Sequence, residues 1–550
     1  MSLRYQPAGK IPEETMRVAR AALPKPSIYM QMRDELGTVY EAQDFEKLFP
    51  QRGQPAEDPV LLALATIMQL AEGLSDRQAE EAVRARIDWK YALGLELTDP
   101  GFDHTVLSEF RSRLSAGEAE ELLLNKLLSR LRELNLLKAR GEQRSDSTHV
   151  LGAIRVLNRL ERVGETLRAA LNALAVAAPD WLREQAPAEW FDRYATRVEN
   201  YRLPKTETAR QELAAIIGAD GERLLKAVEV ATDLAWLREL PAVVMLRQMW
   251  AEQYTSENRS LRWRSVKEMP SSAEMIASPY DPEARWSTKR TVEWVGYKVH
   301  LTETCDQDAP RLITHVETTP ATTPDDNMLT TIHEELAAKE LLPQEHLVDK
   351  GYTDAEVLVT SQQEHQVRVI GPVAFDASWQ ARAGEGFGKG DFIVDWEAET
   401  VTCLAGKKSL SWLPNIDATK VGAIRVHFSR RDCTPCAFRS QCTKAKIEPR
   451  ELMLLKRAEH EALQQRRRQQ TTPEFKQQYA ARAGIEGTHS QGVRRCGLRR
   501  SRYIGLAKTH LQHVLTAVAL NIDQVRGWLM GTLLAQTRCS HFAALQRATG

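Results

Sequence analysis

The sequence lacks a net charge, a long apolar run and the cysteine pattern of a secreted protein. Its 550 residues carry 74 basic and 74 acidic side chains, so the formal net charge is zero. A surface that binds a polyanion must therefore come from basic residues clustered in one part of the molecule. Seven cysteines is an odd number, and the chain is too long to be a disulfide-stabilised miniature. We therefore expect reduced thiols and a cytoplasmic protein.

Membrane segments are also absent from the sequence. No apolar run is long enough to cross a bilayer, and residues 1–7 contain no apolar segment typical of a signal peptide. We expect neither a membrane span nor a signal peptide. The composition, with 43% apolar and 27% charged residues, is that of an ordinary globular protein long enough for several domains.

Helix-start and helix-stop signals are dense in the N-terminal part. Asp58 and Pro59 predict a helix that begins there and ends at Gly73. Ser75 opens a capping box with Gln78, and Ser115 is predicted to open another. Residues 58–138 are therefore predicted to be helical. Such a domain either binds DNA or packs on the next domain.

The apolar pattern then predicts an α/β protein with two insertions. Strands are expected at 292–302, 311–317, 345–349 and 367–373, with helices at 327–339 and 354–364. The fold class is a mixed sheet flanked by helices. The predicted domains are an N-terminal helical domain that binds DNA ends (1–138), the first core strand (139–154), a helical insertion (155–278), core strands and helices (279–374), a β-rich cysteine-bearing insertion (375–450), C-terminal core helices (451–530) and a tail (531–550).

Three acids stand out by their context in this order. Asp146 lies in a polar strand-like segment, Asp349 ends an apolar strand, and Glu486 lies in a late helix. Converging carboxylates repel one another unless divalent cations neutralise them, and oxygen ligands select Mg²⁺ or Mn²⁺. Two such ions support in-line phosphoryl displacement. Each acid alone has a plain alternative as a turn former, a loop residue or one partner of a surface ion pair.

The motifs Asp146-Ser147-Thr148, Asp349-x-Gly351-Tyr352 and Tyr479-x-x-Arg482-x-x-x-Glu486 together resemble those of bacterial insertion-sequence transposases of the DDE class. Segments 74–78, 89–95 and 110–114 are similar to the N-terminal domain of the branch called, in words, the eleven-eighty-two group. The sequence departs from that family at Val493, where a basic residue is usual, although Arg494 and Arg495 follow directly.

The resemblance implies a ribonuclease-H-like core with Asp146, Asp349 and Glu486 as catalytic metal ligands. It implies cleavage of transposon ends to leave a 3′-hydroxyl, which then attacks target DNA within a multimer assembled on DNA. Tyr479 and Arg482 are predicted to share one helix face with Glu486 and to hold the DNA backbone.

Further basic residues are candidates for contacts with DNA. Lys298 and His300 alternate on one strand face, which either contacts DNA or is simply solvated. A glycine-broken arginine cluster follows Glu486 and is typical of a phosphate track. Its members are Arg494, Arg495, Arg499, Arg500 and Arg502.

Four cysteines form a second constellation: Cys403, Cys433, Cys436 and Cys442. One Cys-x-x-Cys pair with two further thiols predicts a structural Zn²⁺ site, with His427 as a substitute ligand. The alternative is four reduced, merely buried thiols.

The function that we expect is therefore transposition. Two alternatives stay open: a ribonuclease-H-like nuclease without strand transfer, and a catalytically silent DNA-binding protein derived from a transposase.

Overall fold

The computed structural model describes residue 3 and residues 10–50, 52–117, 119–257, 260–383, 387–414 and 423–532. Most of the predicted tail and of residues 1–7 lies outside this part. Contacts divide the chain into two compact units. One comprises residues 1–141, 303–314 and 514–550, and the other comprises residues 142–302 and 315–513.

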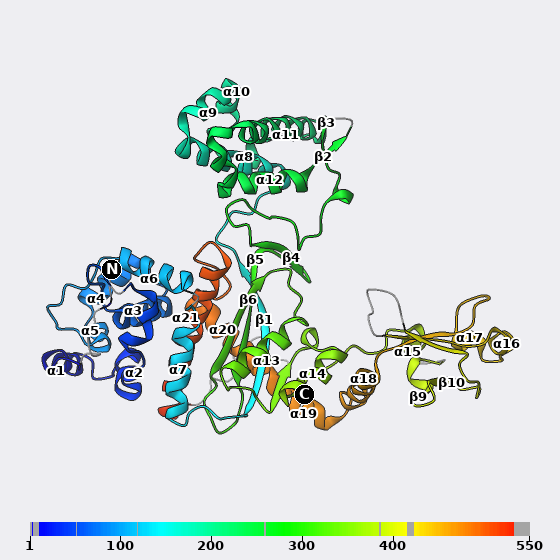
Figure 1. The fold of residues 1–550 in the computed structure, drawn as a ribbon. Coiled ribbons are helices and arrows are strands. Elements are labelled where there is room, and N and C mark those ends of the chain that lie inside the picture. The colour runs from blue at the N-terminus through cyan, green and yellow to red at the C-terminus, as the bar shows by residue number, and fades with distance from the viewer. Residues whose placement is uncertain are drawn as a thin grey trace, which may run out of the picture. The chain divides into compact units, whose positions relative to one another are not determined.

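The first unit begins with the helices coloured blue in Figure 1. The Asp58 carboxylate accepts a hydrogen bond from the amide of Val60 (2.9 Å), and Gly73 ends the same helix in the left-handed conformation (φ 69°). Ser75 opens the next helix through the predicted capping box. These helices are α1 Glu13–Ala22, α2 Ile28–Leu36, η1 Ala42–Leu48, α3 Pro59–Glu72, α4 Asp76–Ala85, α5 Ile87–Leu93, α6 Thr105–Ala116 and α7 Leu122–Glu133.

The capping box predicted at Ser115 is wrong. The buried side chains of Leu107, Phe110 and Leu114 keep the chain helical through this point, so Ser115 lies in the last turn of α6. Helix α7 begins only at Leu122.

A mixed six-stranded sheet organises the second unit, in the order β4-β5-β1-β7-β8 with β6 paired to β5. Pairs β1–β7 and β7–β8 are parallel, and β4–β5 is antiparallel. The predicted strands and both predicted helices of this region are present, so the chain is a mixed α/β protein. The elements are β1 Glu142–Leu151, β4 Arg285–Lys289, β5 Val292–Thr304, β6 Ile313–Pro320, α13 Met328–Ala338, β7 Glu345–Val348, η5 Lys350–Tyr352, α14 Ala355–His365 and β8 Arg368–Ile370.

Strand β1 lies between β5 and β7, and it is buried although most of its side chains are polar. A buried polar group costs stability unless it has a partner. Gln143 donates to the carbonyl of Leu341 (2.8 Å). The Ser145 hydroxyl contacts both Thr302 (2.6 Å) and His346 (2.7 Å). Partners from distant parts of the chain therefore make this polar strand stable at the centre of the sheet.

The helical region between β1 and β4 has a core of its own, built on Val163, Leu167, Ile217, Leu246 and Trp250 among others. The Tyr254 and Trp250 rings pack in a tilted arrangement within it, with ring centroids 5.3 Å apart. Its elements are α8 Arg159–Ala177, α9 Pro179–Gln185, α10 Ala188–Tyr194, η2 Asn200–Arg202, α11 Glu207–Val230, η3 Thr232–Glu239, α12 Pro241–Gln253, β2 Tyr254–Glu257, β3 Ser260–Trp263 and η4 Val266–Glu268.

Small elements with short strands follow β8. They are α15 Trp379–Ala383, η6 Lys389–Asp391, β9 Ile393–Asp395, β10 Thr400–Thr402, β11 Ser411–Pro414, β12 Ile424–His427, α16 Arg430–Cys433, α17 Arg439–Cys442 and β13 Glu451–Leu454. Strand β12 pairs with both β11 and β13, and β9 pairs with β10.

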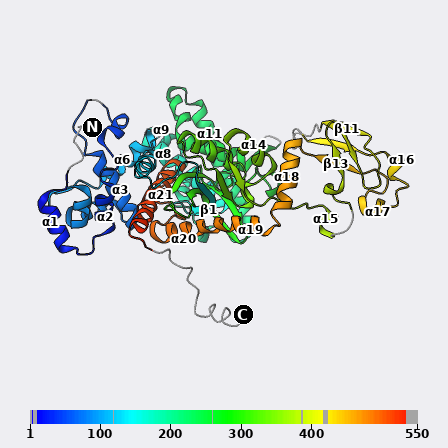
Figure 2. The same cartoon turned by 90° about the horizontal axis from the view of Figure 1, so that it is seen from below.

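The last helices are α18 Arg457–Gln469, α19 Pro473–Tyr479, η8 Ala480–Gly484, α20 Ile485–Cys496 and α21 Leu506–Leu529. Helices α18 and α19 are separate, because Thr472 caps a new helix with Pro473 at its first position. Segments α19 and α20 (orange in Figure 2) follow each other closely, and α20 contacts β1.

Within the described residues, no helix combines the length and the apolar character that a membrane crossing requires.

Candidate active site

The register of the sheet places Asp146 beside Asp349. Strands β1 and β7 run parallel, and Ser145 is the partner of Val348. Asp349 directly follows the end of β7, and Asp146 is the next residue of β1, which continues to Leu151, so the two acids lie side by side where β7 ends. Carboxyl ends of parallel strands are where open α/β sheets place their sites. Asp349 also caps η5, because its carboxylate accepts a hydrogen bond from the Gly351 amide (2.8 Å).

A single guanidinium group joins the three predicted acids. Arg482 Nη2 lies 2.8 Å from Asp146 Oδ2 and 4.0 Å from Asp349 Oδ2. Arg482 Nη1 lies 3.4 Å from Glu486 Oε1. The structure therefore brings Asp146, Asp349 and Glu486 together around Arg482, and we call these four residues the acid site.

The acid site has a buried side and an open side. The side chains of Asp146 and Arg482 are 12% and 14% exposed, that of Asp349 is 31% exposed, and that of Glu486 is 68% exposed. A large charged ligand can therefore approach from the side of Glu486, whereas Asp146 is already shielded from bulk water.

The electrostatics of the site follow from this burial. Burial raises the pKa of Asp146, the Arg482 charge lowers it, and Asp349 raises it, with a net upward shift. Burial lowers the pKa of Arg482, but Asp146, Tyr479, Asp349 and Glu486 outweigh that effect and raise it. Arg482 is therefore a permanent cation that makes it easier for Asp146 to ionise.

The sequence predicts that Tyr479, Arg482 and Glu486 share one α-helix. In the structure they lie on three successive helical segments. Helix α19 ends at Tyr479, the turn η8 has the tighter 3₁₀ hydrogen bonding, and α20 begins at Ile485. The buried Arg144 side chain donates to the carbonyl of Ala481. A Cβ atom on Gly484 would lie 2.1 Å from an Arg144 nitrogen, so this close approach suits glycine. Tyr479 stacks on Phe475, with ring centroids 5.8 Å apart.

Lys298 and His300 both have partners within the protein. The Lys298 ammonium lies 3.0 Å from Asp325 Oδ1 and 2.7 Å from the carbonyl of Thr323. His300 is fully buried, and its Nδ1 lies 2.6 Å from the Tyr352 hydroxyl. Burial lowers the pKa of His300 to about 4. The His300 ring therefore does not lie on a solvated strand face, and its contact with DNA stays a prediction.

Asp325 is an acid of this region that the sequence reasoning missed. Its second carboxylate oxygen accepts a hydrogen bond from the Ser147 hydroxyl (3.1 Å), and Ser147 directly follows Asp146. Gly351, two residues after Asp349, also lies against Asp325. Asp349 is selected from the sequence because it ends a strand. Asp325 follows strand β6 at a short distance, so a search for acids after strands would have included it.

The arginine cluster is attached to the strand that carries Asp146. The amide of Leu151, the last residue of β1, donates to the carbonyl of Arg499 (2.9 Å), and the amide of Ser501 donates to the carbonyl of Leu151 (2.8 Å). Arg499 Nε also donates to the Thr148 hydroxyl (2.8 Å). Arg494, Arg499, Arg500 and Arg502 are exposed, and Arg495 is half-buried.

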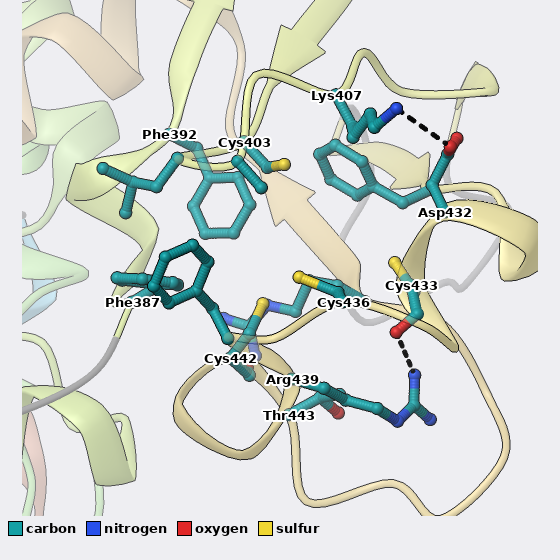
Figure 3. Close-up of a pocket in the computed structure, with 15 residues that line it drawn as sticks. Phe387, Phe392, Cys403, Lys407, Asp432, Cys433, Cys436, Arg439, Cys442 and Thr443 are labelled. Atoms are coloured by element: carbon teal, nitrogen blue, oxygen red, sulfur yellow. Dashed lines mark hydrogen bonds and ion pairs between the residues drawn. The ribbon is translucent and has the colours of Figure 1, made fainter.

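The four predicted cysteine ligands line a common cavity together with several phenylalanines, as Figure 3 shows. His427 does not line it, and its ring instead lies 3.8 Å from the Glu451 carboxylate.

The chemistry of the acid site suits a hard divalent cation, because its donors are carboxylate oxygens. In the described part of the chain, no group of three or more His, Cys, Asp or Glu side chains is arranged to hold a metal ion. The Arg482 guanidinium instead lies among the three acids and offsets part of their negative charge.

Two family models match the chain. One, described as "Transposase DDE domain", matches residues 402–526, and the other, described as "Transposase domain (DUF772)", matches residues 18–113. The first match includes Glu486 and the arginine cluster, whereas Asp146 and Asp349 precede it. No curated protein and no solved structure matches the chain. The two family matches support a transposase function and imply a nucleotidyl-transfer enzyme that acts on DNA.

Proposed function

We propose that the chain is a DDE transposase that cleaves the ends of an insertion sequence and joins them to target DNA. The observation that carries this proposal is the meeting of Asp146, Asp349 and Glu486 at Arg482, in the order along the chain that the DDE class requires. The two transposase family matches support it independently.

Asp146 and Asp349, with Glu486, would hold Mg²⁺ or Mn²⁺. When bound, such ions activate an attacking oxygen and stabilise the leaving oxygen of a phosphodiester. Arg482 meanwhile offsets part of the charge of the carboxylates, and its planar fork suits a phosphate oxygen once the acids have another cation. Asp146 has to be ionised to act as a ligand, and the Arg482 charge favours that form.

A ribonuclease-H-like core is part of the same proposal. The central β1 with its parallel neighbour β7, the parallel β8 beyond, and the paired β5 and β6 on the other side support it. The α13 and α14 helices connect β6 to β7 and β7 to β8 in chain order. The helical and the cysteine-bearing regions would then be insertions into this core.

The exposed arginines after α20 would hold the DNA backbone beside the acid site, because arginine neutralises phosphates at close range. Residues 18–113 would bind the DNA ends, and several chains would assemble on them. A cytoplasmic location, where bacterial DNA lies, follows from this function.

The decisive experiment offers the purified chain a duplex that carries the ends of the element encoding it, with Mg²⁺. Wild type should nick the ends and then join them to a target plasmid. Asp349→Asn and Asp349→Ala should bind the same duplex but do neither. Asp326→Asn is the matched control, because Asp326 is an exposed acid outside the acid site. Equal cleavage by wild type and both Asp349 variants would refute the proposal.

The same assay separates the alternatives. Cleavage that never yields joined products would indicate a nuclease without strand transfer. Binding without cleavage in wild type, with either Mg²⁺ or Mn²⁺, would indicate a catalytically silent DNA-binding protein.

A further inference from the structure

Four cysteine side chains from three segments line one cavity in the β-rich region after β8 (Figure 3). Cys403 directly follows β10, Cys433 ends α16, Cys436 lies in the next turn, and Cys442 ends α17. We call these four residues and their cavity the cysteine pocket. All four thiols are free, so no disulfide accounts for their proximity.

Two tight turns present these thiols. The carbonyl of Cys403 accepts a hydrogen bond from the amide of Gly406 (2.8 Å), whose φ of 72° favours glycine. The carbonyl of Cys433 accepts one from the amide of Cys436 (3.4 Å). Each turn places a cysteine at the start of a four-residue loop, which is the local geometry by which short loops present thiolates to a metal.

The backbone around the thiols is held by arginines. Arg439 donates to the carbonyl of Cys433 (3.1 Å), and Arg450 donates to the carbonyl of Cys442 (3.0 Å). The Arg450 charge also acts on the Cys442 thiol. Cations close to thiols favour the thiolate form, which is the form that binds metals.

The apolar core of this region is small. Among the described residues it consists of six buried side chains: Phe392, Val401, Val426, Phe428, Leu452 and Leu454. Cys403, Cys433 and Cys442 pack directly against it. A core of this size rarely stabilises a domain without a disulfide or a structural metal. Since the thiols are free, a metal is the stabilising element that the residues can supply.

The size of the cavity restricts the ligand. Its volume is ≈ 30 Å³, which accommodates a single ion or water molecule but no iron–sulfur cluster or organic cofactor. A divalent ion binds cysteines as thiolates, so its binding in this cavity would release thiol protons.

We propose that Cys403, Cys433, Cys436 and Cys442 bind one structural Zn²⁺ ion. As the side chains stand, no three of the described ligand-type residues are arranged to hold an ion. Binding therefore requires the thiols to turn toward the centre of the cavity, about their Cα–Cβ bonds. The role of the ion is to hold together the turns after β10 and α16 with the end of α17, and it does not depend on catalysis at the acid site.

The test measures zinc in the full chain, purified under reducing conditions without added metal. Wild type should carry one equivalent of zinc by mass spectrometry. Cys496→Ser is the matched control, because Cys496 is buried outside the cysteine pocket. This variant should keep one equivalent of zinc. Cys403→Ser and Cys436→Ser should lose it, with affinity reduced about 100-fold or more. Equal zinc in all four proteins would overturn the proposal.

A second measurement needs no variant, so it holds even if the serine variants misfold. Wild type is alkylated with and without a zinc chelator, and the modified cysteines are identified by peptide mass. Zinc should protect Cys403, Cys433, Cys436 and Cys442, and chelation should expose all four. Replacement by Co²⁺ should produce the thiolate-to-cobalt charge-transfer absorption. Protection unchanged by the chelator, or iron in place of zinc, would overturn the proposal.

Discussion

The acid site and the cysteine pocket are assembled in opposite ways. The acid site gathers charged residues from β1, from the turn after β7 and from α20, and the register of two parallel strands sets the position of its aspartates. The cysteine pocket gathers thiol groups from neighbouring turns of one short region. The acid site therefore depends on the whole sheet, whereas the cysteine pocket depends on local turns and, as proposed, on a metal. Substitutions that disturb the sheet should therefore affect the acid site and leave the cysteine pocket unchanged.

The largest effect is expected from Arg482→Gln, which removes the charge shared by the three acids. Cleavage of DNA ends at saturating Mg²⁺ should fall about 100-fold or more, as for the loss of a group that contacts developing charge. Zinc in the cysteine pocket should not change. The matched control is Arg183→Gln in α9, whose exposed guanidinium lies 2.7 Å from the Asp180 carboxylate and outside the acid site and the arginine cluster. A loss of less than about threefold would contradict the assigned role.

The same variant has a predicted pH dependence. Asp146 must be ionised for activity, and its pKa is raised in wild type although the Arg482 charge lowers it. Removing that charge raises the pKa of Asp146 further. The acidic limb of the rate profile in Arg482→Gln should therefore lie at higher pH than in wild type. A limb that stays in place or moves to lower pH would show that Asp146 does not control it.

A smaller effect, on stability, is expected from Gly296→Ala in β5. Gly296 has a φ of 150°, and an added Cβ would lie 2.2 Å from the carbonyl oxygen of Val150 in β1. The free energy of unfolding should fall by about 2 to 4 kcal/mol, as measured by urea denaturation. Gly487→Ala is the control, because its Cβ would meet no atom within 4 Å. A control that loses as much stability would show that the β1–β5 approach is not the cause.

A smaller effect again is expected from Asp325→Asn, which breaks the ion pair with Lys298. Both side chains are about 15% exposed, so the pair is shielded from solvent. We expect cleavage to fall about tenfold, or about 1.4 kcal/mol, because Ser147 beside Asp146 loses a charged acceptor. Asp326→Asn should not change the rate. A double-mutant cycle with Lys298→Met should give a coupling energy of about 1 kcal/mol, and additive effects would contradict the pairing.

The smallest effect is expected from His489→Leu in α20. Burial lowers the pKa of His489 to about 3, and within the described residues its Nε2 has no hydrogen-bond partner. The unfolded chain takes up a proton near pH 6.5, so the folded state loses stability as the pH falls below that value. Between pH 7 and 6, wild type should lose about 0.5 to 1 kcal/mol more than His489→Leu in thermal unfolding. Equal losses would show that His489 is not neutral in the folded state.

The sequence predicts the elements that have local signals better than those that depend on partners. Asp58, Gly73 and Ser75 act as predicted, because caps and stops are local. Strand β1 has no such local signal, since a polar strand looks like a loop until Arg482, Thr302 and His346 supply its partners. Thr472 and Pro473 are a further local signal, which marks the start of α19.

The candidate sites follow the same division. Their acids and cysteines can be selected from the order and spacing of residues, but their contacts cannot. The role of Arg482 as a shared counter-ion, and the presence of Asp325 beside Ser147, depend on the register between distant strands and loops. The burial of His300 likewise depends on Tyr352 and Thr319, which no spacing rule connects to it.

The backbone pairing of Leu151 with residues 499–501 also has a mechanical meaning. The two amide bonds at this point and the contact from Arg499 to Thr148 fasten the arginine-bearing segment to the strand of Asp146. A bent DNA duplex that pulled on those arginines would therefore pull on β1 through backbone hydrogen bonds. The force would not be lost in a flexible side chain. Strand β1 would then connect the arginines that hold the DNA backbone mechanically to Asp146, at the proposed site of cleavage.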